Sequence, residues 1–341
     1  MYNWIGNGRV SRRARVALIA SAAIVAVALS VGAAIKFLFT DPAPPEAPQL
    51  SSVIQHGLIR VGDLDRTYLY YVPANLGAHP SLLFVLHGSR GTGRRMRVLT
   101  AYEFDALADR NNFIVVYPDG FGRTWNDCRR VVSPARQPRV DDVGFIRALV
   151  DHFRGQFGVA ASRVFAIGFS VGGQMAYRLA LEAPDGIAGV GAVAANLPRL
   201  EYSDCKPAQR PAAVMIVNGT EDPVTPYGGG VVGLFKFGTG APVLSTIQTV
   251  TYFSRAAGYQ GDPQVKRYPK LDGDESTWVE QATWDAPSSV EVSLYTIHGG
   301  GHTIPQAKYR LRRILGRTNG DIDCMQEFWE FCQRQMRKGH E

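Results

Sequence analysis

Short apolar runs, each bounded by polar or glycine-containing segments, recur along most of the chain. Runs in which nearly every position is apolar are typical of strands buried on both faces of a sheet. They cover residues 81–86, 113–117, 163–167 and 212–218. Residues 187–194 and the alternating stretch 290–297 are predicted to form two more strands. Residues 57–72 alternate around a Gly-Asp turn, which predicts an antiparallel edge hairpin.

Segments with helical periodicity separate these strands. They cover residues 101–111, 141–157, 174–181, 246–257 and 323–338. Asp141 and Asp142 lie at the start of the second helix, where carboxylates cap the backbone and favour the helix dipole. Strands that alternate with helices predict an α/β fold with a mainly parallel, doubly wound sheet. We expect a single domain over residues 51–341.

The first fifty residues have a different pattern. A basic tail, residues 1–15, precedes an apolar segment, residues 16–39, and a proline-rich linker, residues 40–50. Twenty apolar or small residues at ~1.5 Å each can cross a hydrocarbon core. Arginines before the segment favour a cytoplasmic N-terminus and export of the remainder. We therefore expect a transmembrane signal anchor, with a cleaved signal peptide as the alternative, and a domain on the periplasmic or extracellular face.

The amino-acid composition and the net charge indicate which kinds of molecule the protein is expected to bind. The apolar fraction of 45% and the charged fraction of 20% are ordinary for a globular protein. The net charge of +7 comes from scattered basic residues, which indicate a solvated surface rather than a nucleic-acid groove. We expect no nucleic-acid partner, and contact with a membrane only through the N-terminal segment.

Four cysteines, at positions 128, 205, 324 and 332, lack C-x-x-C spacing, so a zinc or redox motif is not expected. Export would permit disulfides. Cys128 and Cys205 fall in loops at the same end of the predicted sheet, and a bond between them is one interpretation. Cys324 and Cys332 lie about 12 Å apart on one predicted helix, too far to bridge, and are expected to be free.

The segment Gly168-Phe169-Ser170-Val171-Gly172 has the form G-x-S-x-G between a predicted strand and a predicted helix. In this context the serine occupies a strained turn, and the glycines avoid collisions with neighbouring backbone. Ser170 is therefore the candidate nucleophile. The alternative is a glycine-rich strand–helix turn with an idle serine.

A serine hydroxyl needs a base oriented by a third group, and in this architecture the acid and the histidine follow the serine in that order. Asp222 follows the strand at 212–218, and His302 follows the last strand. They are the candidate acid and base. Glu221 and His298 are the nearest rivals. Other acids lie in a loop that no predicted strand presents: Asp262, Asp272 and Asp274.

An oxyanion formed during attack needs two N–H donors. Val171, directly after the candidate nucleophile, and Ser89, after His87-Gly88, are expected to supply them from the backbone. Aromatic residues in or near loops are candidates for a substrate pocket, or equally for ordinary packing: Trp125, Phe169, Tyr227 and Phe235. We expect neither a metal nor an organic cofactor.

Six motifs in a fixed order resemble the polyhydroxybutyrate depolymerase/feruloyl esterase family of secreted α/β-hydrolases. They are Leu86-His87-Gly88, Tyr117-Pro118-Asp119-Gly120, Asp141-Asp142-Val143-Gly144-Phe145, Gly168-Phe169-Ser170, Gly219-Thr220-Glu221-Asp222 and Gly300-Gly301-His302-Thr303-Ile304-Pro305. The resemblance covers residues 57–331 and implies the α/β-hydrolase fold, with Ser170, Asp222 and His302 as its triad. Val171 replaces the usual asparagine, and Tyr259 stands where many members have a cysteine, so one family disulfide is expected to be absent.

These observations predict an exported serine carboxylic-ester hydrolase acting on soluble or oligomeric esters through an acyl-enzyme. The identity of the ester and the oligomeric state are not encoded in any recognisable pattern. Two alternatives remain open: a serine peptidase of the same fold, which usually carries an additional propeller or cap, and an inactive hydrolase fold that serves as an envelope scaffold.

Overall fold

The computed structural model describes residues 11–131, 134–135, 140–206, 210–236, 240–286 and 289–338. The chain divides into two units, one of residues 1–41 with 312–314, and one of the remaining residues. The first ten residues of the predicted basic tail lie outside the described residues. Helix α1 (Arg12–Phe39) belongs to the first unit. Within the described residues, no helix combines the length and the apolarity needed to cross a membrane, so the expectation that residues 16–39 do so is not supported.

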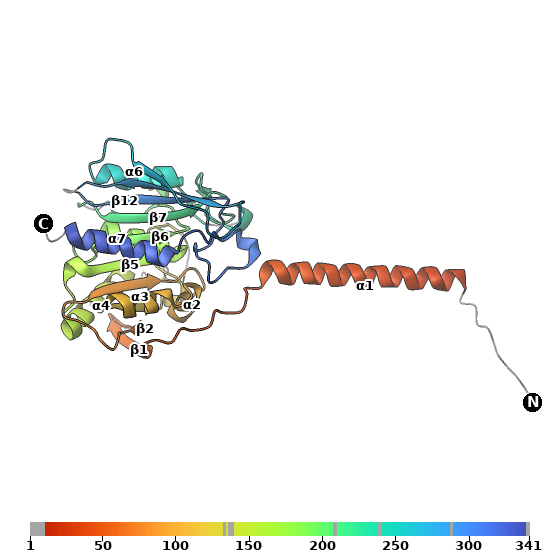
Figure 1. Cartoon of the computed structure of the whole chain (residues 1–341), viewed down its shortest axis with the longest axis horizontal. Helices are drawn as coiled ribbons and strands as arrows, with labels where there is room; N and C mark the ends of the chain where they lie inside the picture. Colours follow the sequence, from red (N-terminus) through yellow and green to blue (C-terminus); the bar gives the residue numbers. More distant parts are fainter. Residues whose placement is uncertain are drawn as a thin grey trace, which may run out of the picture. The chain divides into compact units, whose positions relative to one another are not determined.

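A ten-stranded sheet organises the second unit, in the order β1-β2-β4-β3-β5-β6-β7-β12-β11-β10 (Figure 1). The six strands from β4 to β12 run parallel, and antiparallel pairs close both edges. The strands are β1 (Gln55–Val61), β2 (Leu64–Tyr71), β3 (Ser81–Leu86), β4 (Phe113–Pro118), β5 (Val164–Phe169), β6 (Gly189–Val193), β7 (Ala213–Gly219), β10 (Gln264–Arg267), β11 (Trp278–Trp284) and β12 (Val292–His298). The predicted α/β fold with a mainly parallel sheet is confirmed.

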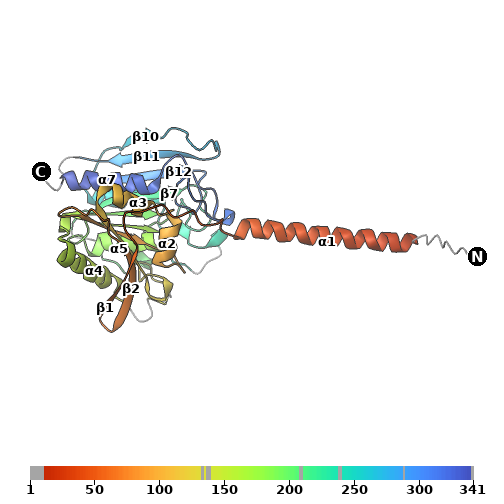
Figure 2. The same cartoon turned by 60° about the horizontal axis from the view of Figure 1, so that its bottom comes forward.

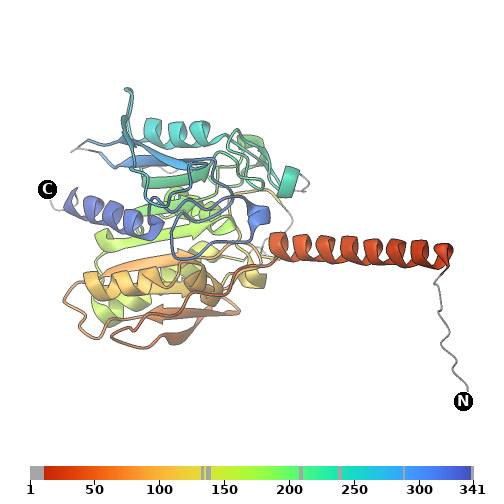
Figure 3. The same cartoon turned by 45° about the vertical axis from the view of Figure 1, so that its right-hand side comes forward.

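Helices cover both faces of this sheet, as a doubly wound fold requires. The helices are α2 (Gly93–Leu99), α3 (Glu103–Asn111), α4 (Asp142–Phe157), α5 (Val171–Glu182), α6 (Thr246–Ala256) and α7 (Cys324–Lys338). One buried cluster joins α4, α5 and α6 to the sheet, and a second joins α2, α3 and α7 to the opposite face (Figure 2). Figure 3 shows α6 and α7 on opposite sides of the strands.

The edge beyond β12 and the helix after β3 differ from the sequence prediction. Strands β10 and β11 were not predicted. All four residues of β10 are exposed and only Val265 among them is apolar, so that segment lacks the pattern of a buried strand. Helix α2 begins after Thr92, whose side-chain oxygen accepts a hydrogen bond from the Arg95 N–H, in a segment for which no helix was predicted. The small sheet of β8 (Gly230–Val231) and β9 (Pro242–Val243) was not predicted either.

Cys128 and Cys205 form a disulfide with their Cα atoms 4.9 Å apart, which confirms the suggested pairing. Cys324 and Cys332 are free and buried on α7, as expected. Burial raises the pKa of both thiols, so they remain protonated and unreactive at neutral pH.

We expect the Cys128→Ser/Cys205→Ser double variant to be less stable than the native chain by about 4 kcal/mol, because the bond closes a long loop in the unfolded chain. The sequence separation of the two cysteines is 77 residues. The midpoint of urea unfolding measures the effect. Dithiothreitol should lower the midpoint of the native chain and leave that of the double variant unchanged. Equal midpoints for the two oxidised chains would contradict this expectation.

Candidate active site

Ser170 occupies a sharp turn between β5 and α5. Its backbone has φ 56° and ψ −117°, a strained conformation for a residue with a side chain. Two hydrogen bonds hold it there: the Ser170 N–H donates to the Val193 carbonyl, and the Gln174 N–H donates to the Ser170 carbonyl. The turn therefore places the hydroxyl at the N-terminus of α5, outside the regular hydrogen bonding of the sheet.

The glycines at positions 168 and 172 are dictated by close backbone contacts. A Cβ atom on Gly168 would lie 2.0 Å from the Gly172 carbonyl oxygen, and one on Gly172 would lie 2.3 Å from the Leu86 carbonyl oxygen. No side chain fits at such distances. The two glycines thus allow β3, β5 and α5 to meet closely enough to form the turn.

Asp222 follows β7 and is held by its own turn. One carboxylate oxygen, Oδ1, accepts hydrogen bonds from the Val224 N–H at 2.7 Å and the Thr225 N–H at 2.8 Å. The other, Oδ2, lies 2.7 Å from Nδ1 of His302. Because a carboxylate only accepts, this contact places the imidazole proton on Nδ1.

His302 reaches the serine from the loop after β12. Its backbone N–H donates to the Leu315 carbonyl at 2.6 Å, and its Nε2 lies 2.9 Å from Oγ of Ser170. With the proton on Nδ1, Nε2 is the free acceptor for the serine hydroxyl. The structure therefore brings Ser170, His302 and Asp222 into one hydrogen-bonded chain, and both His302 and Asp222 are buried.

The rival residues point elsewhere. Glu221 is exposed and forms an ion pair with Arg317. His298 stacks on Trp278 with ring centroids 3.6 Å apart. Asp272 pairs with Lys270 in a loop that β10 and β11 flank.

The two predicted N–H donors lie beside Ser170. Val171 begins α5, and the first N–H groups of a helix have no partner within it. Ser89 follows Gly88, and a Cβ atom on Gly88 would lie only 3.5 Å from Cβ of Ser170. Ser89, Ser170 and Val171 all line one cavity of about 270 Å³.

His87 supports the segment that carries Gly88 and Ser89. Its Nδ1 donates to the Gly88 carbonyl at 2.7 Å, and its Nε2 accepts from the Gly120 N–H at 2.9 Å. Burial lowers the pKa of His87, which favours the neutral ring that this pair of contacts requires.

The cavity wall differs from the aromatic pocket suggested by the sequence. Its lining residues are Ser89, Thr124, Arg129, Val131, Ser170, Val171, Gln174, Val224, Thr225, Val232 and Gly240. Trp125 is buried and donates its indole N–H to the His87 carbonyl. Phe169 packs on the His302 ring with centroids 5.0 Å apart, and the Tyr227 hydroxyl contacts Thr296. None of these three aromatic residues lines the described part of the cavity wall.

Arg129 and Gln174 are the two largest polar side chains of the described wall, and sequence reasoning missed both. Gln174 had the clearer signal, because it lies one helical turn after Ser170. Arg129 could have been noticed as half of a charged pair that flanks Cys128, in a loop already placed at this end of the sheet. Among the described residues, no cluster of histidine, cysteine or acidic side chains is arranged to hold a metal ion.

Sequence comparison places the chain in a family. It is 32% identical over 270 residues to the "Putative esterase NocK" of Nocardia uniformis subsp. tsuyamanensis, across 75% of this chain and 76% of that protein. The chain belongs to the esterase family of α/β-hydrolases. The resemblance to depolymerases and feruloyl esterases is thereby confirmed. No family model matches the chain.

Further esterases of this family match over smaller shares of their length. Feruloyl esterase B of Piromyces equi is 29% identical over 55% of this chain and 33% of its own length. Poly(3-hydroxyalkanoate) depolymerase C of Paucimonas lemoignei is 26% identical over 69% of this chain and 58% of its own length. Among solved structures, an acetyl xylan esterase from Aspergillus awamori shares the fold, with a TM-score of 0.51 and 19% identity over 74% of this chain and 95% of its own.

Proposed function

We propose that the protein is an exported serine carboxylic-ester hydrolase, similar to polyhydroxyalkanoate depolymerases and feruloyl esterases, with Ser170 as nucleophile, His302 as base and Asp222 as orienting acid. The observation that carries the proposal is the continuous chain of short contacts from Ser170 Oγ through His302 to Asp222. Membership in an esterase family supports the choice of an ester as substrate.

In the first half of the reaction, Ser170 Oγ attacks the ester carbonyl while His302 Nε2 takes its proton. Asp222 stabilises the imidazolium that forms, and it remains ionised. The carbonyl oxygen becomes an oxyanion, which the backbone N–H groups of Val171 and Ser89 stabilise. Collapse of this intermediate transfers the proton from His302 to the departing alcohol and leaves an acyl-enzyme on Ser170.

In the second half, His302 accepts a proton from a water molecule that attacks the acyl-enzyme. A second oxyanion forms at the same two N–H groups, and its collapse returns the proton to Ser170 as the carboxylic acid leaves. The proton transfers to and from Ser170 use the contacts between Ser170, His302 and Asp222, and no resident cofactor takes part in them.

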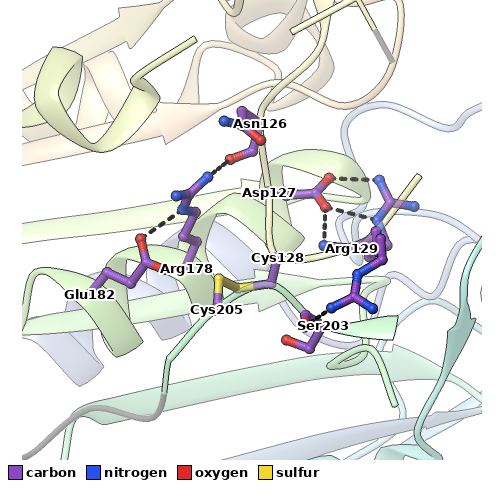
Figure 4. The surroundings of a disulfide bond; sticks show 9 residues. Asn126, Asp127, Cys128, Arg129, Arg178, Glu182, Ser203 and Cys205 are labelled. Atoms are coloured by element: carbon purple, nitrogen blue, oxygen red, sulfur yellow. Dashed lines mark hydrogen bonds and ion pairs between the residues drawn. A yellow bond between two sulfur atoms is a disulfide. The ribbon is translucent and has the colours of Figure 1, made fainter. Parts of the chain in front are cut away.

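Two structural features bear on the size of the substrate group and on the compartment in which the protein works. The cavity of about 270 Å³ is lined by valines and by polar side chains that include Gln174 and Arg129, and its size suits a short acyl or alcohol group. The disulfide between Cys128 and Cys205 (Figure 4) supports export, because such bonds persist in oxidising compartments.

A fluorophosphonate probe and a series of p-nitrophenyl esters from acetate to octanoate test the proposal on the full-length chain. We expect the probe to label the peptide that contains Ser170, and turnover to be greatest with the short acyl groups. A folded chain that neither takes the label nor hydrolyses any ester of the series would overturn the enzyme assignment and favour the scaffold alternative.

A further inference from the structure

The loop that carries His302 is hydrogen-bonded to a later segment of the chain, residues 315–321. The His302 N–H donates to the Leu315 carbonyl at 2.6 Å. The neighbouring Gly301 N–H donates to the Arg317 carbonyl at 2.9 Å. The position of the imidazole therefore depends on the position of this segment, because the segment holds the backbone on which the imidazole is carried.

Regular secondary structure does not fix the segment. Residues 316–321, which all lie within the described part of the chain, form neither helix nor strand apart from an isolated bridge at Arg317. Two buried polar residues lie at its far end, Asn319 and Asp321. The Asn319 carbonyl accepts from the Gln306 N–H at 2.9 Å, which adds a further contact to the loop of His302. Side-chain contacts must therefore hold the far end in place.

Lys270 supplies the central contact of that end. Its Nζ donates to Asp272 Oδ1 at 2.7 Å, to the Thr277 carbonyl at 2.8 Å and to Asp321 Oδ2 at 2.8 Å. The three donors of an ammonium group are thus all engaged. We call this group of four residues the Lys270 cage. Two of its oxygens come from the loop between β10 and β11 and the third from residues 315–321, so the ammonium joins the two segments.

Backbone donors complete the Lys270 cage. Asp321 Oδ1 accepts from the N–H groups of Leu271 at 2.7 Å and Asp272 at 3.1 Å. In the other direction, the Gly320 N–H donates to Asp272 Oδ2 at 2.7 Å. Burial alone would raise the pKa of Asp321, but the bonds from Lys270 and the backbone hold this pKa well below its ordinary value. The carboxylate is therefore ionised at neutral pH, and each segment holds the carboxylate of the other.

The energetics of such a cage favour a role in positioning. The attraction between buried charges is largely offset by their loss of hydration, so a buried ion pair adds little net stability. Its geometry, however, is specific, because each donor has one acceptor in a fixed direction. Support of this kind is what keeps a catalytic group within reach of its partner.

We propose that Lys270 is a positioning residue for the reaction: its ammonium holds residues 315–321, and through them the loop of His302, where Nε2 faces Ser170 Oγ. The inference rests on the proposed esterase function, since it concerns the base of the same triad. Lys270 is not among the described residues that line the cavity. Its removal should therefore lower kcat and leave KM unchanged.

The Lys270→Ala variant of the full-length chain tests this expectation. We expect kcat for p-nitrophenyl acetate, per chain labelled by a fluorophosphonate, to fall about 10- to 100-fold, because small displacements of a catalytic group have effects of this size. KM should stay within about twofold of the native value. The probe should label the same fraction of chains as in the native protein, but more slowly. The circular dichroism spectrum should remain native.

The missing atoms can be supplied from solution. The Lys270 side chain is 25% exposed, so the space that it leaves is open to solvent. The n-propylammonium ion has the three carbons and the nitrogen that alanine lacks. It should restore kcat in a saturable manner, once its direct reaction with the ester is subtracted. We expect no rescue by n-propanol, which has no charge, or by tetramethylammonium, which has no N–H donor.

Lys338 offers a matched control. Its Nζ also contacts one carboxylate and two carbonyls, those of Asp285, of Ala286 at 3.0 Å and of Ser289 at 2.9 Å. These three residues precede β12, whereas His302 follows it, so this second group lies at the opposite end of the strand. Lys338→Ala should keep native kcat, and the n-propylammonium ion should not change it.

Asp272→Asn tests the contact between the two segments while Lys270 stays in place. The amide can present its oxygen to Lys270 Nζ or to the Gly320 N–H, but not to both. We expect kcat to fall by about 3- to 10-fold, the size of one hydrogen bond, again with unchanged KM. This variant decides the question if Lys270→Ala does not fold.

Native kcat in a folded Lys270→Ala chain would overturn the inference, and so would native kcat in Asp272→Asn. A loss confined to KM, a loss that n-propylammonium does not reverse, or an equal loss in Lys338→Ala would also count against it. Each of these results leaves ester hydrolysis by the native chain intact. Failure of the proposed function would instead appear as absence of turnover and of fluorophosphonate labelling in the native chain.

Discussion

Replacing Ser170 by alanine is expected to lower kcat for p-nitrophenyl acetate by about 10⁴- to 10⁶-fold, the range seen when a serine nucleophile is removed from such a triad. The alanine chain keeps the oxyanion donors and the cavity, so a residual rate above that of water alone should remain. KM should change little, because the methyl group still fits the turn. Initial rates over a range of ester concentrations give kcat and KM. Fluorophosphonate labelling tests independently whether the nucleophile has been lost.

A second serine provides the control for this change. Ser254 lies on α6 and donates its hydroxyl to the Thr251 carbonyl one turn earlier. Ser254→Ala should leave both kcat and labelling close to native values. A Ser170→Ala chain that still hydrolysed the ester at a tenth of the native rate or more would exclude Ser170 as the nucleophile.

The Asp222→Asn variant is expected to lower kcat by about 10⁴-fold with little change in the fold. Its Oδ1 can still accept from the Val224 and Thr225 N–H groups, so the turn after β7 persists. The amide, however, presents N–H donors to Nδ1 of His302. The imidazole proton then moves to Nε2, which can no longer accept the proton of Ser170.

Glu221 provides a closely matched comparison, because it is the neighbouring acid and points away from the histidine. Its carboxylate contacts Arg317 at the surface, an interaction worth little to stability. Glu221→Gln should therefore retain native kcat and a native circular dichroism spectrum. Loss of activity in Glu221→Gln together with retention in Asp222→Asn would reassign the acid of the site.

The centre of the sheet could be predicted from the sequence more fully than its edges. The central strands were predictable because each is buried on both faces and is therefore apolar throughout. Ser170, Asp222 and His302 could be placed because each closely follows a predicted strand, apolar throughout before Ser170 and Asp222 and alternating before His302, and parallel strands present their ends at one edge. Val171 and Ser89 were predicted as backbone N–H donors because Val171 directly follows Ser170 and Ser89 directly follows Gly88.

The cavity wall and the outer strands were not predictable by these means. Strand β10 has no buried residue, and its pairing with β11 depends on contacts that local sequence does not reveal. The cavity wall combines residues near positions 124–131, 171–174 and 224–240, which the folded chain brings together. Aromatic residues near loops were the natural candidates, yet Trp125 and Phe169 pack against backbone and His302 instead.

The order of the strands has a kinetic consequence. His302 is 132 residues from Ser170 and 80 from Asp222 in sequence, and its loop is fixed only when β12 pairs with β7. Contacts of such separation close late, because the loop entropy must be overcome before they contribute. During refolding from urea, far-ultraviolet ellipticity should therefore return before hydrolytic activity does. The return of activity in this chain would thus report the moment at which the last strand joins the parallel sheet.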